Sequence, residues 1–140
     1  MSAAGPLLVI LTGPSGAGKD AVLARLKSLG RPGHFAITAT TRPPRKGEQD
    51  GVDYFFVSHE RFQEMLERGE LLENATVYAQ RYGVPRRPVR EALERGRDVI
   101  FRTDVQGARY IKSIVPGATT VFVAAPSEEE LERRLRARAT

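Results

Sequence analysis

Apolar residues along the chain form short continuous runs that alternate with stretches of helical spacing. Three runs predict strands buried on both faces: LLVILTG at residues 7–13, RDVIFRTD at 97–104 and TTVFVAA at 119–125. Residues 19–30, 88–96 and 105–117 instead place apolar side chains three and four positions apart, which predicts helices, and each segment ends at or near a glycine or proline. Strands that alternate with helices indicate right-handed crossovers and a parallel sheet.

Residues 36–85 do not follow this alternation of strands and helices. The stretch 36–58 combines β-type residues, prolines and turn signals, and Ser58 is placed to cap a helix that begins at His59. Residues 70–84 then return to an extended pattern, so the segment predicts an inserted, strand-rich lobe with one helix. Near the end of the chain, Ser127 and Glu130 form a capping box that predicts a final helix over 127–138.

Length and composition narrow the class of protein. With 140 residues, 41% of them hydrophobic and 28% charged, the chain fits one soluble globular domain. Its apolar runs are too short to cross a membrane, and its first residues lack the layout of a signal peptide, so we expect a cytoplasmic protein. The absence of cysteine excludes disulfides, thiolate catalysis and cysteine-based zinc sites.

The charge of the chain points toward an anionic ligand. The net charge is +5, and 18 of the 22 basic residues are arginines, whose guanidinium groups match phosphate oxygens two at a time. Many of these arginines also suit a solvated helix surface. Because acidic residues are interleaved with them, we expect no nucleic-acid partner.

The stretch GPSGAGKD at residues 13–20 fits the pattern of a phosphate-binding loop, directly after a strand and directly before a helix. Glycines let backbone N–H groups turn toward one point, and the lysine supplies a cation for the outer phosphates of ATP. Asp20 stands where such loops usually have a hydroxyl; its carboxylate is also a ligand for Mg²⁺. We therefore predict that a nucleotide binds through Gly13, Pro14, Ser15, Gly16, Ala17, Gly18, Lys19 and Asp20, with Asp20 at the metal; the family resemblance described next implies that this nucleotide is ATP.

Four further segments carry a resemblance to the guanylate kinase family: TTRPPRKGEQDGVDYFF at 40–56, EN at 73–74, RYGVP at 81–85 and TDVQGA at 103–108. The resemblance runs from the strand before Gly13 to the last residue. It implies an α/β fold, with a P-loop nucleoside monophosphate kinase core, a parallel sheet and an inserted strand-rich lobe that binds GMP. The core would comprise residues 1–35 and 86–140, and the lobe residues 36–85. The implied reaction is phosphoryl transfer from ATP to GMP.

The resemblance also assigns residues to the acceptor site. Glu73 matches the reader of guanine, and an ionised carboxylate suits that role because it accepts from both guanine N1–H and the neighbouring amine, whereas N1 of adenine is itself an acceptor. Two arginines flank a Pro-Pro pair and are expected to converge on one monophosphate. The predicted GMP-binding residues are Thr38, Arg42, Arg45, Tyr54, Glu73, Tyr82 and Asp104, and the predicted catalytic residues are Lys19, Arg134 and Arg138. The two histidines match no catalytic role.

Two departures from the family qualify these expectations. Arg102 stands where the family has an acid near the metal and phosphates, and we hypothesise that Asp20 and Arg102 are a coupled replacement. The family also continues beyond the point that matches Thr140. We therefore expect a C-terminally shortened fold with reduced turnover, and low stability or association because apolar surface stays uncovered.

Two other functions compete with this interpretation. Ribose 1,5-bisphosphate phosphokinases share the Gly-Lys-Asp end of the loop, but their acceptor has no base, so the guanine residues would be unnecessary. A non-catalytic binding module, like the guanylate-kinase-like domains of scaffold proteins, usually lacks the loop lysine that Lys19 provides here. The sequence leaves the oligomeric state open.

Overall fold

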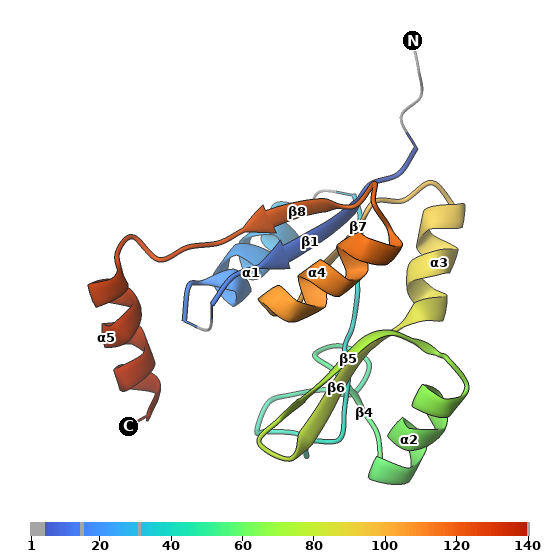
Figure 1. The fold of residues 1–140 in the computed structure, drawn as a ribbon, viewed down its shortest axis with the longest axis horizontal. Coiled ribbons are helices and arrows are strands. Elements are labelled where there is room, and N and C mark those ends of the chain that lie inside the picture. Colours follow the sequence, from blue (N-terminus) through green and yellow to red (C-terminus); the bar gives the residue numbers. More distant parts are fainter. Residues whose placement is uncertain (1–4, 15, 31, 140) are drawn as a thin grey trace.

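The structure is a computed structural model that describes residues 5–14, 16–30 and 32–139. It contains two four-stranded sheets with helices packed around them (Figure 1). The elements in chain order are β1 (Leu8–Thr12), α1 (Lys19–Ser28), β2 (His34–Phe35), β3 (Ala39–Thr40), β4 (Phe55–Phe56), α2 (His59–Glu67), β5 (Leu71–Val77), β6 (Gln80–Pro85), α3 (Arg86–Glu94), β7 (Val99–Arg102), α4 (Val105–Ile114), β8 (Thr119–Phe122) and α5 (Glu128–Ala139).

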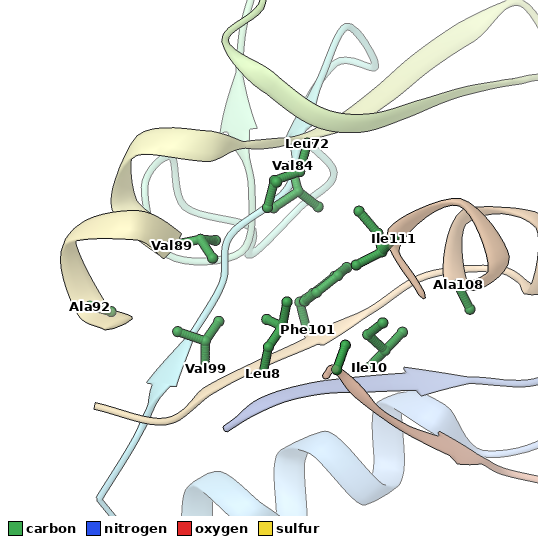
Figure 2. Packing of buried hydrophobic residues seen from close by; sticks show 11 residues of the cluster. Leu8, Ile10, Leu72, Val84, Val89, Ala92, Val99, Phe101, Ala108 and Ile111 are labelled. Carbon is green, nitrogen blue, oxygen red and sulfur yellow. The ribbon is translucent and has the colours of Figure 1, made fainter. Parts of the chain in front are cut away.

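The first sheet has the strand order β2-β7-β1-β8, and each of its three strand pairs is parallel, which confirms the predicted parallel sheet. Helix α1 lies on one face of this sheet, and α3 and α4 lie on the other (Figures 1 and 2). Because the strands are parallel, their carboxyl ends share one edge, where the loop after β1 and the start of α4 follow β1 and β7. Ligands of open α/β sheets bind at this edge.

The main core lies between the sheet and α3 and α4 (Figure 2). Two fully buried side chains of the sheet, Ile10 of β1 and Phe101 of β7, face the equally buried Ile111 of α4. Burial of side chains of this size stabilises a fold by roughly 1.5 to 3 kcal/mol each. Two members of the same cluster, Leu72 and Val84, come from the lobe, so the apolar core ties the lobe to the sheet.

The lobe is built on the second sheet, with strand order β4-β3-β6-β5, and helix α2 packs against it. Ser58 caps α2 as predicted, accepting a hydrogen bond from the backbone N–H of Arg61 at 3.0 Å. Strands β5 and β6 form a hairpin whose two turn residues, Tyr78 and Ala79, both have positive φ. That conformation matches the twist of the strands. The elements from β3 to β6 form the predicted strand-rich lobe with one helix. The boundaries of that lobe at residues 36 and 85 stay a prediction.

One prediction about burial is wrong. The run at 119–125 does form a strand, but β8 is the edge strand, and all four of its residues are exposed, including Phe122 at 59%. Helix α1 likewise covers the sheet loosely: Leu23 and Leu26 are half-buried, whereas Leu29 is exposed. Apolar spacing shows which face can be buried, and neighbouring elements decide whether it is. Within the described residues, no helix is long and apolar enough to span a membrane.

Candidate active site

A cleft of about 670 Å³ opens at the carboxyl edge of the parallel sheet, between the phosphate loop and the lobe. Its lining combines the predicted loop with most of the predicted acceptor site. The loop and α1 contribute Gly13, Pro14, Gly16, Gly18, Lys19 and Asp20. The predicted acceptor site contributes Thr38, Tyr54, Glu73, Tyr82 and Asp104. The other polar lining residues are Arg102, Thr103 and Gln106.

The phosphate loop needs glycine at its first position. Gly13 is buried with φ of +143°, and a Cβ atom there would lie 2.1 Å from the backbone carbonyl oxygen of Val123. At the other end, Gly18 caps α1 in a left-handed conformation, so the helix starts beside the cleft and directs the positive end of its dipole toward it. The Nζ atom of Lys19 donates to the carbonyl of Gly13 at 2.7 Å and therefore lies over the loop. Ser15, also predicted here, lies outside the described residues.

Asp20 and Arg102, the two residues that depart from the family, form an ion pair. This contact is what the hypothesis of a coupled replacement requires. Mg²⁺ bound with ATP takes most of its ligands from phosphates and water and only one or two from carboxylates. Asp20, 64% exposed at the first turn of α1, can supply one such oxygen. No group of three acidic or histidine side chains that could hold a metal ion occurs in the described part of the chain.

Arg42 and Arg45 gather around a carboxylate of the chain itself, that of Glu48. The Arg42 guanidinium donates to both oxygens of Glu48 at 3.0 Å, and the backbone N–H of Arg45 donates to one of them at 2.7 Å. These bonds lower the pKa of Glu48 and raise that of Arg42. One guanidinium, that of Arg42, and one backbone N–H, that of Arg45, thus meet on this anion. The convergence of two guanidinium groups on a phosphate stays a prediction, and neither arginine belongs to the cleft lining.

Tyrosine side chains connect this arginine with the cleft. The guanidinium carbon of Arg42 lies 5.1 Å from the ring centroid of Tyr54, and the rings of Tyr54 and Tyr82 meet edge to face at 6.3 Å. The hydroxyl group of Tyr54 also accepts a hydrogen bond of 2.9 Å from Nη2 of Arg102. Phenol groups can bind a phosphate without adding charge, and both predicted tyrosines line the cleft.

Glu73 is a buried carboxyl group at the inner wall of the cleft, with only 8% of its surface exposed. Leu71 packs in the lobe core and Leu72 in the main core, because successive residues of a strand face opposite sides, and a register shift marks a bulge between Leu71 and Asn74. Burial and the nearby charge of Asp104 raise the pKa of Glu73 to about 7, while a hydrogen bond from Thr103 opposes that shift. The carboxyl group therefore titrates near neutral pH.

Helix α4 closes this end of the cleft. Asp104 caps the helix and accepts from the backbone N–H of Gly107 at 2.7 Å. Gly107 has to lack a side chain, because a Cβ atom there would lie 2.0 Å from Oγ1 of Thr103 and 2.9 Å from Oε2 of Glu73. The close approach of the helix to β5 depends on that glycine.

Helix α5 lies against the phosphate loop through one side of its first turns. A Cβ atom on Gly16 would lie within 3.4 Å of the side chains of Leu131 and Leu135. Arg134 donates to Glu130 at 2.9 Å and to the carbonyls of Gly16 and Ala17 at 3.4 Å, so its guanidinium lies beside the loop. The side chain of Arg138 lies outside the described residues.

Sequence reasoning missed Thr103 and misassigned one element. The strand predicted over residues 97–104 includes both Arg102 and Asp104, but β7 ends at Arg102 and Asp104 caps a helix. Since the alternation of a strand stops there, Arg102, Thr103 and Asp104 all line the cleft. The signal available in the sequence was the helix that begins at Val105, which required a cap immediately before it.

Comparisons with known proteins point to one family. The family model described as guanylate kinase matches residues 6–140. Among curated relatives, the chain is 46% identical to guanylate kinase of Clostridioides difficile over 134 residues and 49% identical to that of Corynebacterium efficiens over 135 residues. It is 45% identical over 131 residues to guanylate kinase 2, chloroplastic/mitochondrial, of Oryza sativa subsp. japonica.

A solved structure agrees with the fold. The crystal structure of guanylate kinase from Anaplasma phagocytophilum superimposes with a TM-score of 0.76 at 31% identity, covering 96% of this chain and 68% of that one. The matches cover 96%, 95% and 93% of this chain for the Clostridioides, Corynebacterium and rice relatives. They cover 65%, 71% and 46% of those proteins, so the chain spans about two thirds of the bacterial relatives and about half of the plant one.

Proposed function

This chain belongs to the guanylate kinase family, and from that premise we propose that it transfers the γ-phosphoryl group of ATP to the phosphate of GMP. In this reaction an oxygen of the GMP phosphate attacks the γ-phosphorus, the bond from that phosphorus to the β–γ bridging oxygen breaks, and GDP and ADP are formed. The enzyme's contribution is to hold the two phosphates in line and to surround them with positive charge.

The observation that supports this proposal most directly is a single cleft lined by both the phosphate loop and a buried carboxylate. In its ionised form Glu73 accepts two hydrogen bonds from the base, from N1–H and from the exocyclic amine of guanine. Thr38 and Asp104 line the same cleft and are the further residues proposed to contact the base. Adenine lacks both donors at these positions, so AMP would leave the carboxylate unpaired.

Residues that line this cleft or lie beside it support assignments for the phosphates. Arg42, Tyr54 and Tyr82 would bind the GMP phosphate, with Arg45 contributing positive charge from its exposed position. The loop amides and Lys19 would bind the outer phosphates of ATP. Arg134 lies beside the loop and would offset charge that develops during transfer, a role also proposed for Arg138. Mg²⁺ that arrives with ATP would neutralise part of the phosphate charge, and Asp20 is the residue proposed to hold it. A cytoplasmic location stays a prediction.

Calorimetric titration of the chain with GMP and with AMP tests the proposal. GMP is expected to bind at least about 100-fold more tightly, because AMP loses two hydrogen bonds to a buried charged group. Glu73→Gln should remove most of that difference, whereas Glu70→Gln, the same change at a more exposed site just before β5, should preserve it. Equal binding of GMP and AMP would refute the assignment, and tighter binding of ribose 1,5-bisphosphate than of GMP would favour the phosphokinase alternative.

A further inference from the structure

The side chain of Arg102 joins the two halves of the cleft. It leaves the last residue of β7, and its Nη1 atom forms the ion pair with Asp20 in the first turn of α1. Its Nη2 atom donates to the Tyr54 hydroxyl in the lobe at 2.9 Å. A single guanidinium therefore spans from the helix that follows the phosphate loop to the segment proposed to bind the acceptor phosphate.

Arg102 also lies beside a second arginine across one aromatic ring. The guanidinium carbons of Arg42 and Arg102 lie 5.1 and 5.9 Å from the ring centroid of Tyr54. A phosphate oxygen that accepts from the Tyr54 hydroxyl would lie no more than about 6 Å from Nη2 of Arg102, given an ordinary O–H···O length. A small rotation of the arginine would then bring it into direct contact with that phosphate.

The two ends of the Asp20–Arg102 pair differ in their exposure to water. The Arg102 side chain is 29% exposed and Asp20 is 64% exposed. Burial lowers the pKa of Arg102, yet a guanidinium stays charged in proteins. A partly buried cation paired with a well-solvated carboxylate gains little from that pair, whereas a dianionic phosphate offers two charge-assisted hydrogen bonds.

We propose that Arg102 is a ligand of the acceptor phosphate, contacting it on the side that faces the phosphate loop, and that Asp20 holds the guanidinium in place until the phosphate binds. This inference rests on the proposed function, since it concerns the same monophosphate. It assigns binding to a residue that stands where the family has an acid. The alternative is a structural tie in which Arg102 only fastens α1 to β7.

Titration of the full chain with GMP and with guanosine, which lacks the phosphate, separates these roles. Arg102→Met should weaken GMP binding about 10- to 100-fold and leave guanosine binding unchanged, because only GMP loses charged hydrogen bonds. Asp20→Asn should tighten GMP binding about two- to fivefold, since the guanidinium no longer has to leave an ion pair. The matched control is Arg97→Met: Arg97 donates to the carbonyl of Gly33 at the opposite end of β7, and its loss should change neither affinity.

Several outcomes would overturn the inference. Arg102→Met could weaken GMP and guanosine equally, which would indicate a structural role, or it could leave GMP binding intact. Asp20 is exposed, so Asp20→Asn gives a result even if the Arg102 variant does not fold; GMP binding that is unchanged or weaker in this variant would contradict the proposal. If the unmodified chain does not prefer GMP to guanosine, the proposed function fails together with the inference. If it does and Arg102→Met keeps that preference, the inference alone fails.

Discussion

Replacing Glu73 by glutamine should stabilise the folded chain at alkaline pH and leave its stability unchanged in acid. Glu73 is 8% exposed, and its pKa is raised to about 7 from an ordinary value near 4.5, chiefly by burial and then by the charge of Asp104. A shift of that size corresponds to about 3 kcal/mol, at 1.36 kcal/mol for each pKa unit. Glutamine has nearly the same shape and no charge, so the variant avoids this cost.

The direction follows from where the protons are bound. Because the pKa of Glu73 is higher in the folded than in the unfolded chain, the folded chain binds more protons between about pH 4.5 and pH 7. The free energy of unfolding therefore falls as pH rises through this window. The difference between variant and unmodified chain should grow from near zero at pH 4 to about 3 kcal/mol at pH 8, in favour of the variant.

Urea denaturation at several pH values between 4 and 8 measures this difference, with Glu70→Gln reporting the effect of the same chemical change at a more exposed site on the turn before β5. A difference that does not depend on pH, or one in which the glutamine variant is less stable at pH 8, would refute the reasoning.

Guanosine affinity of the unmodified chain should rise tenfold per pH unit up to about pH 7 and then level off. Guanosine is preferred to GMP in this titration because a phosphate monoester itself titrates near pH 6.

Three further substitutions test other parts of the structure. Gly107→Ala should abolish guanosine binding and lower the melting temperature, because its Cβ would lie 2.0 Å from Oγ1 of Thr103; unchanged binding by calorimetry would show that α4 can move aside. Phe62→Ala, at a fully buried site in the lobe, should lower the free energy of unfolding by about 3 to 5 kcal/mol in urea denaturation, and a loss below 1 kcal/mol would mean that the lobe core is loosely packed. Asp20→Ser and Arg102→Glu should lose kinase activity in a strongly non-additive way in a double-mutant cycle, since the two side chains are paired; additive losses would remove the coupling.

The parts of the fold that the sequence predicted are those specified by neighbouring residues. The apolar run of β1, the glycines of the loop and the caps at Ser58 and Ser127 each act within a few residues, and the structure contains all of them. Exposure of β8 could not be predicted in this way. Phe122 has the sequence environment of a buried strand residue, and only the arrangement of distant elements leaves it uncovered.

In the candidate site, too, the sequence predicted the residues but not the contacts between them. The resemblance selected Glu73, Tyr54 and Asp104, and the structure brings them to one cleft. Which charged groups pair with one another depends on distances that a motif does not contain. The partner of Arg42 is Glu48, and Thr103 donates to Glu73 because a helix begins two residues after it.

Because Arg42 and Glu48 form a bidentate pair, a phosphate that binds Arg42 has to displace the Glu48 carboxylate. Binding at Arg42 therefore exchanges one anion for another. A weakly basic anion such as chloride would gain almost no binding free energy from this exchange. A doubly charged phosphate would form stronger hydrogen bonds with the guanidinium than the carboxylate does. Glu48 also keeps the Arg42 guanidinium oriented when no phosphate is bound, so the side chain does not have to adopt a new rotamer when the phosphate binds. Under the proposed function, Glu48 would exclude small anions and keep the guanidinium oriented for the acceptor phosphate.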